Sequence, residues 1–184
     1  MYEVIRSRRK TLSLQLRPDG TVLVRSPLRT SSREIDAFVR RHEAWIRIHR
    51  QKLEERREIN ASVPSLTQEQ MQELAREAAR VIPLRAAWYA PQIGVTYGRI
   101  TIRFQRTRWG SCSSKGNLNF NSLLMLAPPE VLDSVVVHEL CHRKEMNHSD
   151  RFYREVLRVF PEYHRWHGWL KENGSALLSR LPKT

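Results

Sequence analysis

The residues best suited to chemistry form the stretch His138-Glu139-Leu140-Cys141-His142, an HExxH pattern. On an α-helix, residues four apart share one face and lie about 6 Å apart along the axis, so both imidazoles can reach one metal ion. Three valines at positions 135–137 precede the motif and favour a buried helix. The glutamate beside the first histidine is suited to take a proton from water next to the ion. The pattern predicts a zinc site with His138 and His142 as ligands and Glu139 as the catalytic base.

A catalytic zinc site needs a third protein ligand and one open coordination position. His148 lies six residues after His142, a spacing also used by metzincins, although Glu145 stands where those enzymes have glycine. Asn147 tolerates left-handed backbone, so it is suited to end the helix and return His148 to the metal. Glu162, 20 residues after His142, is the other candidate, as in zinc enzymes with a glutamate ligand. The spacing favours His148 and leaves Glu162 open.

Alternating apolar residues predict a β-hairpin near the N-terminus, over residues 11–25 with Pro18-Asp19-Gly20 as the turn. Residues 2–6 are a candidate third strand of this hairpin or meander. A capping box formed by Ser31 and Glu34 starts a long helix. Residues 60–65 have the composition of a linker. We therefore expect a hairpin-plus-helix unit over residues 1–62 and a catalytic core over residues 63–184, with one compact domain as the alternative.

The second part of the chain mixes helices with short strands. Residues 99–104 and 117–122 alternate between apolar and polar side chains, as half-buried strands do. Pro83 lies inside a helical pattern and is expected to kink or end that helix. The predicted fold class is α+β, with a small antiparallel sheet and a helix that carries the HExxH motif. Helices are expected to begin near residues 67, 128, 149 and 163.

The net charge of +13 is concentrated in two segments. Residues 1–30 hold 7 basic and 2 acidic side chains, and residues 78–129 hold 7 basic and no acidic ones. The positive electrostatic field of such segments favours anionic partners. The second segment contains the candidates for phosphate or other anion binding, which are Arg99, Arg103, Arg106, Arg108 and Lys115.

Four segments, taken in order, resemble a known family: Arg108-Trp109-Gly110-Ser111-Cys112-Ser113, Asn117-Leu118-Asn119-Phe120-Asn121, residues 136–142, and Asn147-His148-Ser149. With residues 9–12 and 18–22, they make the chain similar to YgjP-like metallopeptidases, relatives of the SprT-like and WLM zinc proteases, over nearly its whole length. The resemblance implies a compact zincin-like core, a Zn²⁺ cofactor and His148 as the third ligand. Cys141 departs from the family pattern, and we expect it to be a buried thiol.

The motif and the resemblance together predict a zinc metallopeptidase that acts on a peptide or protein substrate, with Glu139 as general base. Substrate is expected to lie along an edge strand, for which residues 117–121 are the candidate. The oxyanion and substrate contacts are left open among four side chains, which are Asn119, Arg151, Tyr153 and Trp109.

Two alternatives stand beside peptide hydrolysis. Metal-activated water also attacks phosphorus, and the resemblance includes proteins linked to nucleotide pyrophosphatase activity, so a nucleoside triphosphate is a second substrate class. The charge also suits phosphate contacts with nucleic acid, as in a DNA-associated SprT-like protease or a nonspecific binding protein.

The sequence also indicates where the protein acts. No apolar stretch approaches the roughly 20 residues needed to span a bilayer, and the charged residues within positions 1–6 do not suit a signal peptide. We therefore expect a cytoplasmic protein without a membrane partner, whose two cysteines, Cys112 and Cys141, are thiols.

Overall fold

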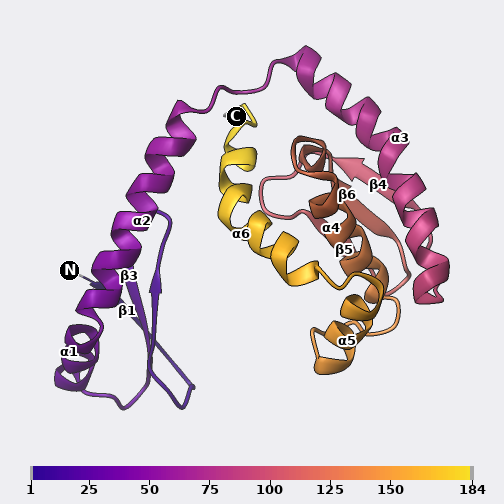
Figure 1. Ribbon diagram of the computed structural model, residues 1–184. Helices are drawn as coiled ribbons and strands as arrows, with labels where there is room; N and C mark the ends of the chain where they lie inside the picture. The colour runs from indigo at the N-terminus through magenta and orange to yellow at the C-terminus, as the bar shows by residue number, and fades with distance from the viewer. Residues whose placement is uncertain (1, 183–184) are drawn as a thin grey trace. The chain divides into compact units, whose positions relative to one another are not determined.

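Each of the two units of the chain, Met1–Ser62 and Val63–Thr184, builds a three-stranded sheet and packs helices on it (Figure 1). The computed structural model describes residues 2–182, and these contain six α-helices. The predicted α+β class is confirmed. Among the described residues, no helix combines the length and the apolar character that crossing a membrane requires.

The sheet of the first unit contains the predicted hairpin. Its strands are β1 (Tyr2–Ser7), β2 (Ser13–Leu16) and β3 (Val22–Pro27). β2 and β3 pair antiparallel, and the turn between them uses Gly20 at a φ of 89°. β1 pairs parallel to β3 on the other side, so the strand order is β1-β3-β2. The sheet is therefore mixed and is not a simple meander.

The helical part of the first unit consists of two helices, α1 (Ser32–Arg41) and α2 (Glu43–Ser62). The predicted single long helix is therefore wrong, because the helix is interrupted at His42, the C-cap of α1. The capping box is present, because the Glu34 N–H donates to Ser31 Oγ and the Ser31 N–H donates to Glu34 Oε2. Apolar side chains of the helices and of β3 form a small core, which comprises Val22, Val24, Ile35 and Ile46.

The second unit begins with α3 (Gln68–Ile93), which runs through Pro83 and does not end there. Proline removes one backbone N–H donor and so destabilises a helix, and the burial of apolar side chains on α3 offsets this loss. Ala78, Ile82 and Ala86 are all fully buried on one face of α3. The helix ends at Gly94, whose φ of 75° is the left-handed conformation that favours glycine at a helix C-terminus.

The sheet of the second unit determines which backbone edges are free near the site. Its strands are β4 (Ile100–Arg103), β5 (Gly110–Cys112) and β6 (Leu118–Asn121), in the order β4-β6-β5. β5 pairs antiparallel to β6 across a tight turn, whereas β4 pairs parallel to β6, so the predicted antiparallel sheet is mixed. The prediction that residues 117–121 form an edge strand is wrong, because β6 is central and paired on both sides.

The helix α4 (Pro129–Cys141) forms the centre of the second unit. It is apolar nearly all round, as expected of a helix covered on every side. It contacts α3, β5 and the two following helices, α5 (Asp150–Val159) and α6 (Tyr163–Ser179). Leu118 and Phe120 of β6 are fully buried in the same core. The short 3-10 helix η1 (Ser122–Leu126) joins β6 to α4.

Candidate metal centre

Three histidine side chains converge at the C-terminal end of α4. The Nε2 atom of His138 lies 3.1 Å from the Nε2 atom of His142 and 3.1 Å from that of His148. The three donor atoms all lie within 4.8 Å of one another. Tetrahedral zinc with nitrogen ligands at 2.0–2.1 Å requires its donors to be about 3.3 Å apart. Two of the three separations are close to this value, and three imidazoles form a donor set that suits a divalent metal such as zinc.

A tight chain reversal brings His148 to the two helix histidines. α4 ends at Cys141, whose carbonyl accepts the N–H of Glu145 at 3.1 Å. The predicted left-handed backbone at Asn147 is wrong, since within residues 2–182 only glycines have positive φ. Its side-chain Oδ1 instead accepts the N–H of Ser149 at 3.1 Å, which turns the chain without left-handed backbone. Ser149 then caps α5 through its hydroxyl.

Phe152 on α5 forms an apolar wall behind the three imidazoles. Its ring centroid lies 4.9 Å from that of His138, 4.6 Å from that of His142 and 5.0 Å from that of His148. The side chain is fully buried. Sequence reasoning missed this role, because an apolar residue at a helical spacing indicates core packing in general.

His138 on α4 and His142 at its C-cap are held in the neutral form that binds a metal cation. Burial, followed by the neighbouring His142, His148 and His167, lowers the pKa of His138 to about 3. Burial also lowers the pKa of His142. The Nδ1 atom of His142 lies 3.0 Å from the carbonyl oxygen of Glu145, so Nδ1 carries the proton and Nε2 keeps its lone pair for a metal.

Glu139 is buried directly against β5. A Cβ atom at Gly110 would lie 2.6 Å from Oε1 of Glu139, so only glycine lets the strand approach this closely. Burial raises the pKa of Glu139 to about 8. Among the described residues this carboxyl forms no ion pair. A divalent cation beside it would favour the ionised form.

Tyr163 links the metal centre to α6. Its Oη lies 2.8 Å from Nδ1 of His138 and 3.3 Å from Nδ1 of His167. The side chain is almost fully buried, and burial raises its pKa. Sequence reasoning missed Tyr163, because the residue lies 25 positions after His138 and nothing local connects the two.

Three other predicted site residues, which are Glu162, Tyr153 and Arg151, do not belong to the histidine group. Glu162 stands at the N-cap of α6, where it pairs with Arg165 at 3.0 Å, and it is not part of the histidine group. Tyr153 is close, with its ring centroid 6.2 Å from that of His148. Arg151 is exposed in the first turn of α5.

The last two candidates for substrate contact, Asn119 and Trp109, lie on β6 and directly before β5. Asn119 pairs with Ser111 across β5 and β6, and its Nδ2 donates to Ser111 Oγ at 3.2 Å. Side chains alternate along a strand, so both point to the face opposite Gly110 and Glu139. Trp109 packs on α6, where a Cβ at Gly174 would lie 3.0 Å from its ring.

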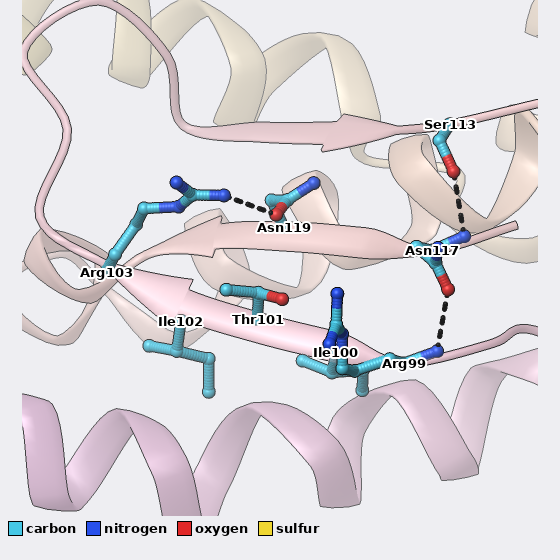
Figure 2. A pocket seen from close by; sticks show the side chains of 8 residues that line it. All are labelled: Arg99, Ile100, Thr101, Ile102, Arg103, Ser113, Asn117 and Asn119. Atoms are coloured by element: carbon cyan, nitrogen blue, oxygen red, sulfur yellow. Dashed lines mark hydrogen bonds between the residues drawn. The ribbon is translucent and has the colours of Figure 1, made fainter.

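The five candidate anion-binding residues are not gathered at the histidines. Arg99 and Arg103 lie along β4 with Asn119, on the outer face of the sheet (Figure 2). Arg106 donates to the carbonyl of Pro182. Arg108 and Lys115 are exposed in the connections before and after β5.

Comparisons with known proteins identify the family of this chain. A family model described as "YgjP-like, metallopeptidase domain" matches residues 10–72 and 61–173. The UTP pyrophosphatase of Escherichia coli (strain K12) is 28% identical over 85 residues, which cover 45% of this chain. The chain spans 51%, or about half, of the length of that curated relative.

Two solved structures also resemble this chain over half of its length. The metallopeptidase zymogen abylysin from Pyrococcus abyssi matches with 21% identity and a TM-score of 0.45, covering 50% of this chain and 94% of its own. The zymogen jannalysin from Methanocaldococcus jannaschii matches with 20% identity and a TM-score of 0.45, covering 50% and 95%.

Proposed function

Since the chain belongs to the YgjP-like metallopeptidase family, we propose that it is a zinc-dependent peptidase whose metal is held by His138, His142 and His148. The family implies a divalent metal, and three imidazoles are a donor set that zinc accepts readily. The observation that carries the proposal is the convergence of the three Nε2 atoms beside the buried carboxyl of Glu139.

The chemistry divides between the metal and the protein. When bound, zinc supplies a Lewis acid that polarises a carbonyl and lowers the pKa of water. Glu139 accepts a proton from the attacking water and delivers it to the leaving amine. Gly110 supports this role, because its lack of a side chain leaves room for the carboxyl between α4 and β5.

The geometry favours β5 as the strand along which the substrate lies. Among the described residues β5 pairs only with β6, so its other edge offers unpaired backbone groups. Gly110, at the start of this strand, touches Glu139. An extended peptide added to that edge would bring its backbone past the catalytic carboxyl, as in strand-addition recognition.

The test combines metal analysis with a hydrolysis assay on the purified full chain. Glu139→Gln should keep one equivalent of zinc and lose activity on an unstructured protein by at least about 100-fold. His148→Ala should lose zinc, whereas Glu162→Ala should keep it, since Glu162 lies outside the histidine group. Full turnover in Glu139→Gln, or full zinc content in His148→Ala, would contradict the proposal.

A second candidate function is hydrolysis of a nucleoside triphosphate at the same site. It is favoured by the partial similarity to a protein named UTP pyrophosphatase. Arg99 and Arg103 do not support it, because they lie on the outer face of the sheet. Release of phosphate or pyrophosphate from UTP that is lost in Glu139→Gln, without any peptide cleavage, would favour this function.

A further inference from the structure

The outer face of the sheet in the second unit carries a shallow, open cavity of about 720 Å³ (Figure 2). Guanidinium, amide and hydroxyl groups from β4, β6 and the connection between β5 and β6 line it. Ile100 and Ile102 point away from this polar face, toward α3. The polar lining residues are Arg99, Thr101, Arg103, Ser113, Asn117 and Asn119.

Hydrogen bonds hold these polar groups in place. Nη2 of Arg103 donates to Oδ1 of Asn119 at 3.0 Å, and Asn119 in turn donates to Ser111. At the other end of β4, the backbone N–H of Arg99 donates to Oδ1 of Asn117 at 3.0 Å. A guanidinium has five N–H donors, so Arg103 keeps most of its donors for an anion while one of them fixes its direction.

This face is separate from the metal centre. Gly110 faces Glu139, and its partner Phe120 is fully buried in the core. The neighbouring pair, Ser111 and Asn119, points the opposite way, as the period-two alternation of strands requires. The sheet itself therefore lies between the cavity and the histidines.

The charged side chains that line the cavity, Arg99 and Arg103, are both positive. Residues 78–129, which include all of its lining residues, contain no acidic side chain. Within the described part of the chain, Arg99 and Arg103 form no ion pair, and both are exposed. Two guanidinium groups without an acidic partner, close to hydroxyls and amides, have the chemistry that carboxylates and phosphates bind.

The shape and composition favour an extended peptide over a nucleic acid. β4 is an edge strand that, among residues 2–182, pairs only with β6. Arg99 and Arg103 lie four residues apart, or about 13 Å along a strand, which matches same-face side chains of an extended peptide. None of the lining residues is aromatic, so nucleobases find no ring on which to stack.

We propose that this outer face, between Arg99 and Arg103, is an exosite that binds extended acidic peptide segments away from the metal. The exosite rests on the proposed function in one respect only, which is that the peptide bound there is a substrate of the peptidase. Binding itself requires neither zinc nor Glu139, so the two proposals can fail separately.

The test measures binding of a fluorescent peptide of alternating Asp and Thr to the full chain by fluorescence anisotropy. The same peptide with Asn in place of Asp is the neutral control. Arg99→Gln combined with Arg103→Gln should weaken binding of the acidic peptide more than about 10-fold, because two charge-assisted contacts are lost. The matched control, Arg80→Gln with Arg154→Gln, removes the same charge from exposed positions on α3 and α5 and should change binding less than about twofold.

Three outcomes would overturn the exosite. Equal weakening in both double variants would mean that net charge alone attracts the peptide. Equal binding of the acidic and neutral peptides would mean that carboxylates are not recognised. Tighter binding of a single-stranded oligonucleotide, lost in the Arg99 and Arg103 variant, would assign the face to nucleic acid. Glu139→Gln should bind the acidic peptide as the unchanged protein does, which separates binding from hydrolysis.

Discussion

The Oη atom of Tyr163 lies 2.8 Å from Nδ1 of His138, on the side of the imidazole opposite its converging Nε2. A partner at this position fixes the tautomer and the ring direction of a metal-binding histidine. The contact joins α6 to α4, and His167 extends it by one more hydrogen bond. The metal centre is therefore supported from a helix that contributes no ligand to the histidine group.

Removing this support should weaken metal binding. Tyr163→Phe deletes the hydroxyl and leaves the ring, so we expect zinc affinity to fall about 10-fold to 100-fold with little change in the fold. Competition with a chromophoric zinc chelator measures the affinity. Tyr97→Phe is the control for losing a tyrosine hydroxyl elsewhere, and equal affinities in the two variants would contradict the supporting role.

The close approach of β5 to Glu139 predicts an unusual sensitivity at Gly110. In Gly110→Ala the new methyl would lie 2.6 Å from Oε1, so the carboxyl must move. We expect peptidase activity to fall at least about 10-fold and stability to fall by about 1–3 kcal/mol, with zinc retained. Gly168→Ala on α6 meets nothing within 4 Å and should be neutral or slightly stabilising. Activity assays and thermal melts of both variants check this, and an active Gly110→Ala protein would exclude the proposed position of Glu139.

The stability of the folded protein should depend on the ionisation of Glu155 over a defined range of acidic pH. Hydrogen bonds from Arg158 and then Lys144 lower the pKa of Glu155 to about 2, at distances of 2.6 Å to each cation. The unfolded chain has a pKa near 4.3. A lowered folded pKa stabilises the protein above about pH 4.3, and this stabilisation is lost as pH falls toward 2.

We therefore expect Glu155→Gln to lower the free energy of unfolding by about 1 kcal/mol at pH 7, after allowance for solvent screening. The difference from the unchanged protein should shrink between pH 4 and pH 2, approximately the range between the two pKa values. Urea titrations across pH measure it. Glu172→Gln, at an exposed position on α6, is the control, and a difference that persists unchanged at the lowest pH would contradict the pairing.

Metal removal should destabilise the second unit. Zinc that binds only the folded protein adds about 2.7 kcal/mol at a free concentration 100 times its Kd. A chelator should therefore lower the melting temperature of the zinc-loaded protein. His142→Ala should abolish that shift, whereas His164→Ala, outside the histidine group, should keep it. Calorimetry with and without chelator distinguishes these outcomes.

Local sequence predicted the features that depend on nearby residues. His138 and His142 share a helix face because they are four residues apart, whatever the rest of the fold does. Capping by Ser31 and Glu34 and the hairpin around Gly20 likewise depend on contacts within a few positions. The α+β class and the resemblance to YgjP-like metallopeptidases were predicted from such segments, and both are confirmed.

Only the tertiary structure decided how distant segments meet. Strand order made β6 central and β5 an edge, and side-chain alternation then turned Asn119 away from Glu139 and toward Arg103. The contact of Tyr163 with His138 and the close approach of Gly110 to Glu139 likewise arise only when distant segments pack together. Packing across the core selects such partners by shape and hydrogen bonding over long chain separations, and no local periodicity records that choice.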